Sequence, residues 1–69
     1  MDNGTVKWFN KGRGYGFVMP DDGGKDIFLH VSAWLKAGLT DYPEEGDEVR
    51  FEAGPGRGGK TQVTRIELR

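Results

Sequence analysis

Glycine and proline interrupt this chain so often that no long helix fits anywhere in it. Twelve glycines and three prolines are spread over 69 residues, and both disfavour the interior of a helix. The runs between them are short and rich in β-branched and aromatic residues, which is typical of strands. Five strands are expected, at residues 4–11, 14–19, 26–31, 47–53 and 61–68.

A single helical turn is expected between the third and fourth strands. Ser32 is a plausible N-cap for residues 33–37, and Gly38 is a plausible end. Five strands and one turn suit a small closed barrel, because closure removes exposed strand edges. A chain of this length makes one domain, so we expect a single all-β domain over residues 1–69.

The composition excludes several classes of protein. The chain has no cysteine, which excludes disulfides and thiolate metal sites, and one histidine, which excludes a multi-histidine metal cluster. No apolar run is long enough to cross a bilayer or to act as a signal peptide. We therefore expect a cytoplasmic protein with no membrane partner, no metal and no cofactor, and nothing demands more than a monomer.

The net charge of −1 conceals an uneven distribution of charge. Residues 1–20 carry three bases and one acid, residues 21–48 carry two bases and eight acids, and residues 49–69 carry five bases and two acids. If the two basic ends meet in the fold, they make one positive face. The alternative is that these are ordinary solvated charges.

Alternation separates aliphatic from ring side chains in the third expected strand. Ile27, Leu29 and Val31 share the face expected in the core, which leaves Phe28 and His30 facing outward. In the second expected strand, two aromatic residues lie opposite two glycines, and this pattern alone leaves their direction open.

Pairing of these two strands favours an outward direction for the aromatic residues of the second strand. A short loop with two glycines makes the strands antiparallel neighbours, so Tyr15 and Phe17 come beside Phe28 and His30. Exposed rings near basic residues suit a single-stranded nucleic acid, because bases stack on rings and cations meet phosphates. A barrel that binds a peptide on the same face is the alternative.

The first expected strand does not fit regular alternation. Lys7 and Trp8 have opposite parity, so both can reach one ligand only at a bulge or an edge position. Trp8 as a buried core residue remains an alternative.

Three blocks of sequence together resemble the cold-shock domain family. They are residues 7–10 (KWFN), 13–18 (RGYGFV) and 26–30 (DIFLH), followed by Ser32-Ala33, Glu45-Gly46, Val49 and Phe51. The resemblance covers nearly the whole chain. It implies a five-stranded antiparallel OB-type barrel that binds single-stranded RNA and DNA, with a preference for pyrimidine-rich strands, and that acts as an RNA chaperone.

The resemblance also implies which residues bind. The expected stacking residues are Trp8, Tyr15, Phe17, Phe28 and His30. The expected contacts to the backbone or to base edges are Lys7, Arg13 and Arg57, with Phe9 and Asp26 as further candidates. Asp26 either accepts a hydrogen bond from a base or caps the adjoining turn.

Three positions depart from the pattern of the family. Val31 and Leu39 stand where an aromatic residue is usual, and Trp34 stands where an aliphatic residue is usual. Trp34 either extends the stacking surface or packs in the barrel. Alternation sends Val31 inward, whereas the resemblance sends it outward.

Residues 54–61 (GPGRGGKT) match a phosphate-binding loop, G-x-x-x-x-G-K-[ST], at every position. That loop needs a following helix, yet only eight residues rich in strand formers remain. We therefore interpret the segment as a hairpin connection and expect a binding protein, not an enzyme.

Overall fold

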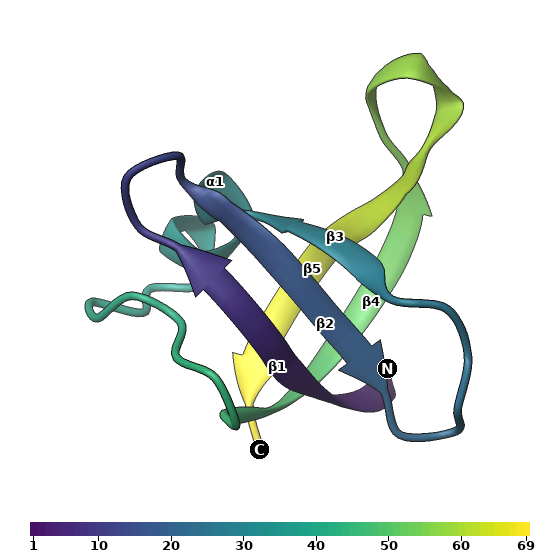
Figure 1. Cartoon of the computed structure of the whole chain (residues 1–69), viewed down its shortest axis with the longest axis horizontal. Coiled ribbons are helices and arrows are strands. Elements are labelled where there is room, and N and C mark those ends of the chain that lie inside the picture. The colour runs from purple at the N-terminus through teal and green to yellow at the C-terminus, as the bar shows by residue number, and fades with distance from the viewer.

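The five strand-forming runs pair into a closed barrel (Figure 1). The computed structural model describes residues 1–69, apart from the side chain of Arg57. Its elements are β1 (Asp2–Asn10), β2 (Tyr15–Pro20), β3 (Ile27–His30), α1 (Val31–Lys36), β4 (Glu48–Pro55) and β5 (Thr61–Leu68). Every strand lies within two residues of its expected bounds. The all-β prediction with one helical turn between the third and fourth strands is confirmed.

The strands follow the order β1-β2-β3-β5-β4 around the barrel, and β4 returns to β1. Four of the five pairings are antiparallel. The exception to the expected antiparallel barrel is β3 with β5, which run parallel where Phe28 lies opposite Gln62. The other pairings require this direction. β1 and β3 both run antiparallel to β2, and β1 and β5 both run antiparallel to β4, so β3 and β5 run the same way.

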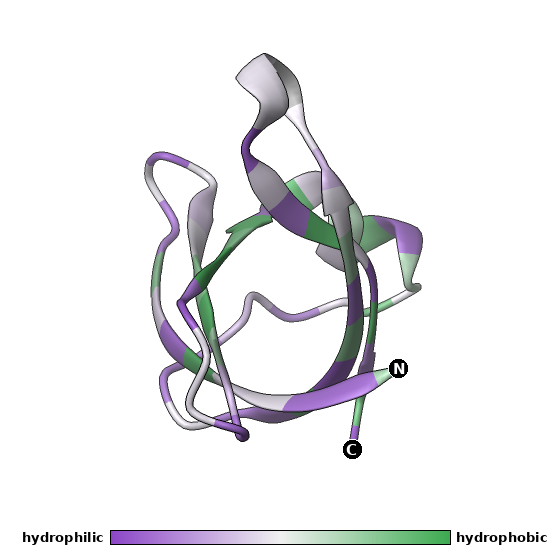
Figure 2. Cartoon of the chain, turned by 90° about the vertical axis from the view of Figure 1, so that its right-hand side faces the viewer, coloured by the Kyte–Doolittle hydropathy of each residue, from purple (hydrophilic) through white to green (hydrophobic). Residues whose placement is uncertain are grey.

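The core fills the space that the strands surround in Figure 2. Its buried apolar side chains come from all five strands and α1: Val6, Val18, Leu29, Ala33, Trp34, Val49, Phe51, Val63 and Ile66. Leu29 lies inward as alternation predicts. Val18 also lies inward, so Tyr15 and Phe17 on the other face of β2 are left outside the core, as the pairing argument predicts.

The helix differs from its expected form at its start. α1 begins at Val31, and its N-cap is His30, so the prediction of a Ser32 cap is wrong. The end is as expected, because Gly38 follows the C-cap with φ +80°, a conformation that glycine adopts without strain. Val31 is half-buried as the first residue of the helix, so strand alternation does not decide its direction.

Trp34 packs in the barrel and does not extend the stacking surface. Only 3% of its surface is exposed, and its indole N–H donates a hydrogen bond to the carbonyl oxygen of Asp41. That bond satisfies the one polar group of a side chain that is otherwise suited to the core.

Candidate nucleic-acid interface

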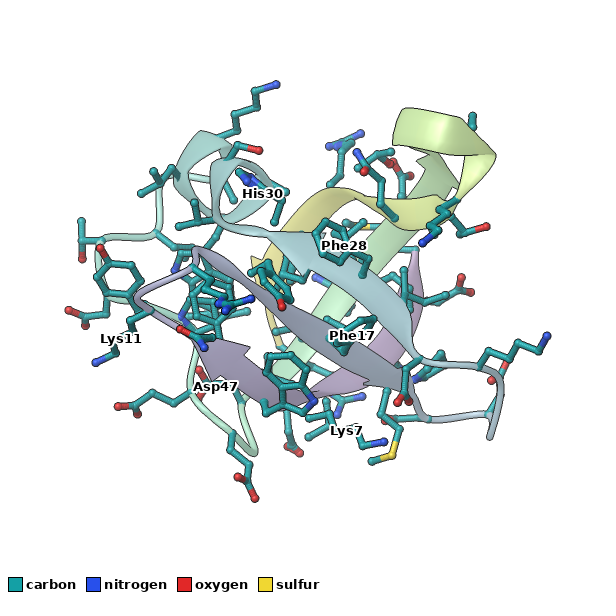
Figure 3. All side chains as sticks on the ribbon, turned by 45° about the horizontal axis from the view of Figure 1, so that its top comes forward. Lys7, Lys11, Phe17, Phe28, His30 and Asp47 are labelled. Carbon is teal, nitrogen blue, oxygen red and sulfur yellow. The ribbon has the colours of Figure 1, made fainter. Side chains whose placement is uncertain are left out.

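Five ring side chains from three adjacent strands form a continuous surface outside the core, here called the ring platform: Trp8 from β1, Tyr15 and Phe17 from β2, and Phe28 and His30 from β3. Trp8 and His30 are exposed, and the other three are half-buried. Tyr15 lies opposite His30 and Phe17 opposite Phe28 in the β2–β3 register. Figure 3 shows Phe17, Phe28 and His30 on one side of the sheet.

The rings contact one another in an unbroken chain. The centroid of Trp8 lies 5.2 Å from that of Phe17 and 5.8 Å from that of Tyr15. The centroid of Phe28 lies 5.5 Å from Tyr15, 5.9 Å from Phe17 and 6.4 Å from His30. Contact at these distances fixes the rings in place before any ligand arrives, which lowers the entropic cost of binding.

A bulge in β1 places Lys7 and Trp8 together on the outside. Val6 pairs with Val18 and Trp8 pairs with Phe17, so Lys7 is one residue too many in the ladder. An extra residue breaks the alternation of faces. Both side chains are exposed, Trp8 at 39%. The buried alternative for Trp8 is therefore wrong, and of the bulge and the edge position that the sequence left open, the structure has the bulge.

The ring platform continues into an open groove of about 900 Å³ between β3 and the start of β5. The groove is lined by Phe17, Asp26, Phe28, His30, Ser32, Lys60, Thr61 and Gln62. Sequence reasoning placed neither Thr61 nor Gln62 at a site. A threonine and a glutamine do not by themselves indicate a binding site. These two residues reach the groove because β5 pairs with β3, where Gln62 lies opposite Phe28.

Several basic residues are already held in ion pairs with acidic residues of the protein. Three arginines near the C-terminus form ion pairs: Arg50 with Glu67, Arg65 with Glu52 at 3.7 Å, and Arg69 with Asp21 at 2.7 Å. The hydrogen bond with Asp21 raises the pKa of Arg69. The positive face expected from the two basic ends is therefore smaller than the charge count suggests. Among the Lys and Arg side chains that the structure describes, Lys60 is the one that lines the groove.

Lys7 is also paired, because its Nζ lies 2.8 Å from Oδ2 of Asp26. Asp26 itself lines the groove. The cap of the adjoining turn is Asp22, whose carboxylate accepts the backbone N–H of Gly24, so the capping role considered for Asp26 is wrong. The Asp26 carboxylate instead lies beside the ammonium group of Lys7.

Phe9 does not belong to the ring platform. It is half-buried against the core, and its ring centroid lies 6.2 Å from that of Tyr42. Nζ of Lys11 lies 5.5 Å from the Tyr42 centroid, a cation–π contact. Tyr42 is 48% exposed, and sequence reasoning did not single it out. Figure 3 shows Lys11 at the left edge of the molecule and Lys7 below Phe17.

Two further predicted residues lie in loops. Arg13 lies in the β1–β2 turn, where its backbone N–H donates to Oδ1 of Asn10. Arg57 lies in the β4–β5 connection, and its side chain is outside the described part of the chain.

The segment that matches a phosphate-binding loop is a hairpin connection, as predicted. β4 runs to Pro55, a 3₁₀ turn covers Arg57–Gly59, and β5 starts at Thr61. Two backbone N–H groups are used within the turn, from Gly56 to the Lys60 carbonyl and from Gly59 to the Gly56 carbonyl. A strand follows where phosphate binding needs a helix N-terminus.

A small closed barrel with this strand order and with rings on its outer sheet face is typical of the OB-type class of nucleic-acid-binding domains. The comparison with family models is specific within that class. The model described as the 'Cold-shock' DNA-binding domain matches residues 2–67. The chain belongs to the cold-shock domain family.

The curated relatives are cold shock proteins or cold shock-like proteins by name. The probable cold shock protein y4cH of Sinorhizobium fredii and cold shock protein CspA of Rhizobium meliloti are each 48% identical over 52 residues, covering 75% of this chain and 74% of theirs. Cold shock-like protein CspE of Escherichia coli is 43% identical over 65 residues, covering 94% of this chain and 93% of its own. As for membranes, the part of the chain that the structure describes contains no helix long and apolar enough to cross one.

Proposed function

We propose that this protein binds single-stranded RNA and DNA with little sequence selectivity, by stacking bases on the ring platform. The observation that carries the proposal is the unbroken chain of five rings outside the core, which opens into a groove beside Lys60. Every base has a flat apolar face, so stacking tolerates sequence, and cations at the rim neutralise the phosphates. Lys7, Arg13 and Arg57 are the further proposed contacts.

The same mechanism supports a role as an RNA chaperone. The ring platform can stack only bases that are not already stacked in a duplex, so binding favours the melted strand by mass action. We propose that the chain acts as one monomeric domain in the cytoplasm, that it prefers pyrimidine-rich strands, and that it catalyses no reaction. The family description and the cold shock relatives support this proposal.

A fluorescence titration tests the proposal directly. An oligopyrimidine single strand is expected to quench Trp8, which is exposed in the ring platform, and to leave the emission of the buried Trp34 unchanged. A duplex of the same length is expected to bind far more weakly, because its base faces are covered. Trp8→Phe is the matched control, which removes the quenching and keeps a ring for stacking.

Two outcomes of that titration would contradict the proposal. Equal affinity for the duplex would exclude base stacking as the basis of binding. An affinity that does not fall with rising salt would exclude phosphate contacts and would instead favour the apolar peptide ligand considered for the same face.

The Lys7–Asp26 pair leads to a prediction of tighter binding. Asp26→Asn removes a negative charge from the groove and releases Lys7 to meet a phosphate. We expect affinity to rise several-fold and the salt dependence of log K to steepen by about 0.7, the value for one more phosphate contact on a single strand. Titrations at several salt concentrations measure both. A loss of affinity would show that Asp26 accepts a hydrogen bond from a base.

Tyr42 is proposed as an additional stacking residue, held beside Phe9 and Lys11. Tyr42→Ala is expected to weaken binding of long single strands by roughly 1 kcal/mol, the lower end for one stacked base. Strands too short to extend from the ring platform to Tyr42 should bind with unchanged affinity. A chain-length series measures the difference, and equal effects at all lengths would remove Tyr42 from the site.

A further inference from the structure

His30 has a structural role in addition to its place in the ring platform. It is the N-cap of α1, and its Nδ1 lies 3.1 Å from the backbone nitrogen of Ser32. Nδ1 also lies 3.0 Å from Oγ of Ser32. A backbone N–H can only donate, so Nδ1 must present a lone pair to it. In the neutral ring, the single proton is therefore on Nε2.

The other ring nitrogen faces outward. His30 is exposed and lines the groove with Phe28 and Ser32. The hydrogen bonds of the described residues include contacts to Nδ1 and none to Nε2. The N–H of Nε2 therefore has no acceptor among the described residues. It belongs to the ring platform, because the centroid of the His30 ring lies 6.4 Å from that of Phe28.

We propose that the helix cap locks His30 in its Nε2–H tautomer, so that the groove presents this N–H as a neutral hydrogen-bond donor to an acceptor oxygen of the bound strand. The inference rests on the proposed function and deepens it. If a base turned an amino group toward Nε2, two donors would face each other and no hydrogen bond would form. A keto oxygen or a phosphate oxygen accepts the hydrogen bond.

Nuclear magnetic resonance on the whole chain tests the tautomer without any ligand. The sequence has one histidine, so a long-range ¹H–¹⁵N spectrum at pH 7.5 shows one imidazole and needs no assignment among several. We expect one protonated nitrogen, Nε2, and one unprotonated nitrogen, Nδ1. Ser32→Ala keeps the backbone N–H and is expected to leave this pattern unchanged. A proton on Nδ1 in the parent protein would overturn the proposal.

Addition of oligonucleotides tests the donor. With oligouridylate, we expect the Nε2–H signal to shift and its exchange with water to slow. The same change with a sugar–phosphate oligomer that lacks bases identifies the acceptor as a phosphate oxygen, and a change only with oligouridylate identifies a base oxygen. An unchanged Nε2–H signal while the Phe28 and Tyr15 ring signals shift would overturn the donor and leave the proposed function standing. No shift in any ring would instead refute the proposed function.

Two substitutions separate the cap from the donor. His30→Asn keeps an oxygen that can cap α1 and loses the ring, so its melting temperature should stay close to that of the parent. His30→Phe keeps a ring and loses cap and donor, so it should melt earlier and bind oligouridylate about two- to tenfold more weakly, as expected for one lost hydrogen bond. Full affinity in His30→Phe would overturn the donor role, and an unchanged melting temperature would overturn the cap.

Discussion

Replacing Phe28 by alanine is expected to weaken single-strand binding by roughly 1–3 kcal/mol and to leave the barrel folded. Phe28 contacts three of the other four rings of the ring platform, namely Tyr15, Phe17 and His30. Its loss therefore removes one stacking surface and releases the neighbours that it holds in place. The side chain is half-buried and outside the core, so the free energy of unfolding should change much less than the free energy of binding.

Leu35→Ala is the matched control for Phe28→Ala. Leu35 is a large apolar residue on α1 with 59% of its surface exposed, and it lies outside the groove. Its substitution should change neither binding nor melting. Phe17→Ala is expected to resemble Phe28→Ala. If Phe28→Ala unfolds the domain with no separate binding defect, the ring is a structural residue and the ring platform is wrongly assigned.

Replacing Gly16 by alanine is expected to cost roughly 3 kcal/mol of stability or more, because the clash is with backbone. A Cβ at this position would collide with the carbonyl oxygen of Trp8 and would lie 2.7 Å from Cα of Phe9. Neither group can move unless β1 leaves β2, with which it is paired. A domain of this size has only a few kcal/mol to lose, so a large unfolded fraction is expected at 37 °C.

Gly12→Ala is the matched control for the loss of glycine flexibility. Gly12 lies in the β1–β2 turn with no positive φ, and the nearest atom to an added Cβ is 3.4 Å away. Its substitution should change stability by less than about 1 kcal/mol. Thermal melts followed by circular dichroism compare the two variants. A Gly16→Ala protein as stable as the parent would show that the β1–β2 contact is looser than the structure has it.

Much of the fold could be read from local patterns. The spacing of glycine and proline predicted five strands, and the two-residue period of β3 predicted that Leu29 lies inward and Phe28 outward. The helix start could not be read in this way. Ser32 is a common N-cap residue, yet the cap lies two residues earlier, at His30, because the ring nitrogen of His30 accepts the Ser32 N–H.

By itself, the sequence determined which rings share a sheet face, because alternation along a strand and pairing through a short loop are local properties of the chain. Only the tertiary structure decided what surrounds those rings. The pairing of Lys7 with Asp26 and the positions of Gln62 and Tyr42 beside Phe28 and Phe9 all depend on residues far apart in the chain. Such contacts form only when the barrel closes, since closure sets the register between strands that no short loop connects.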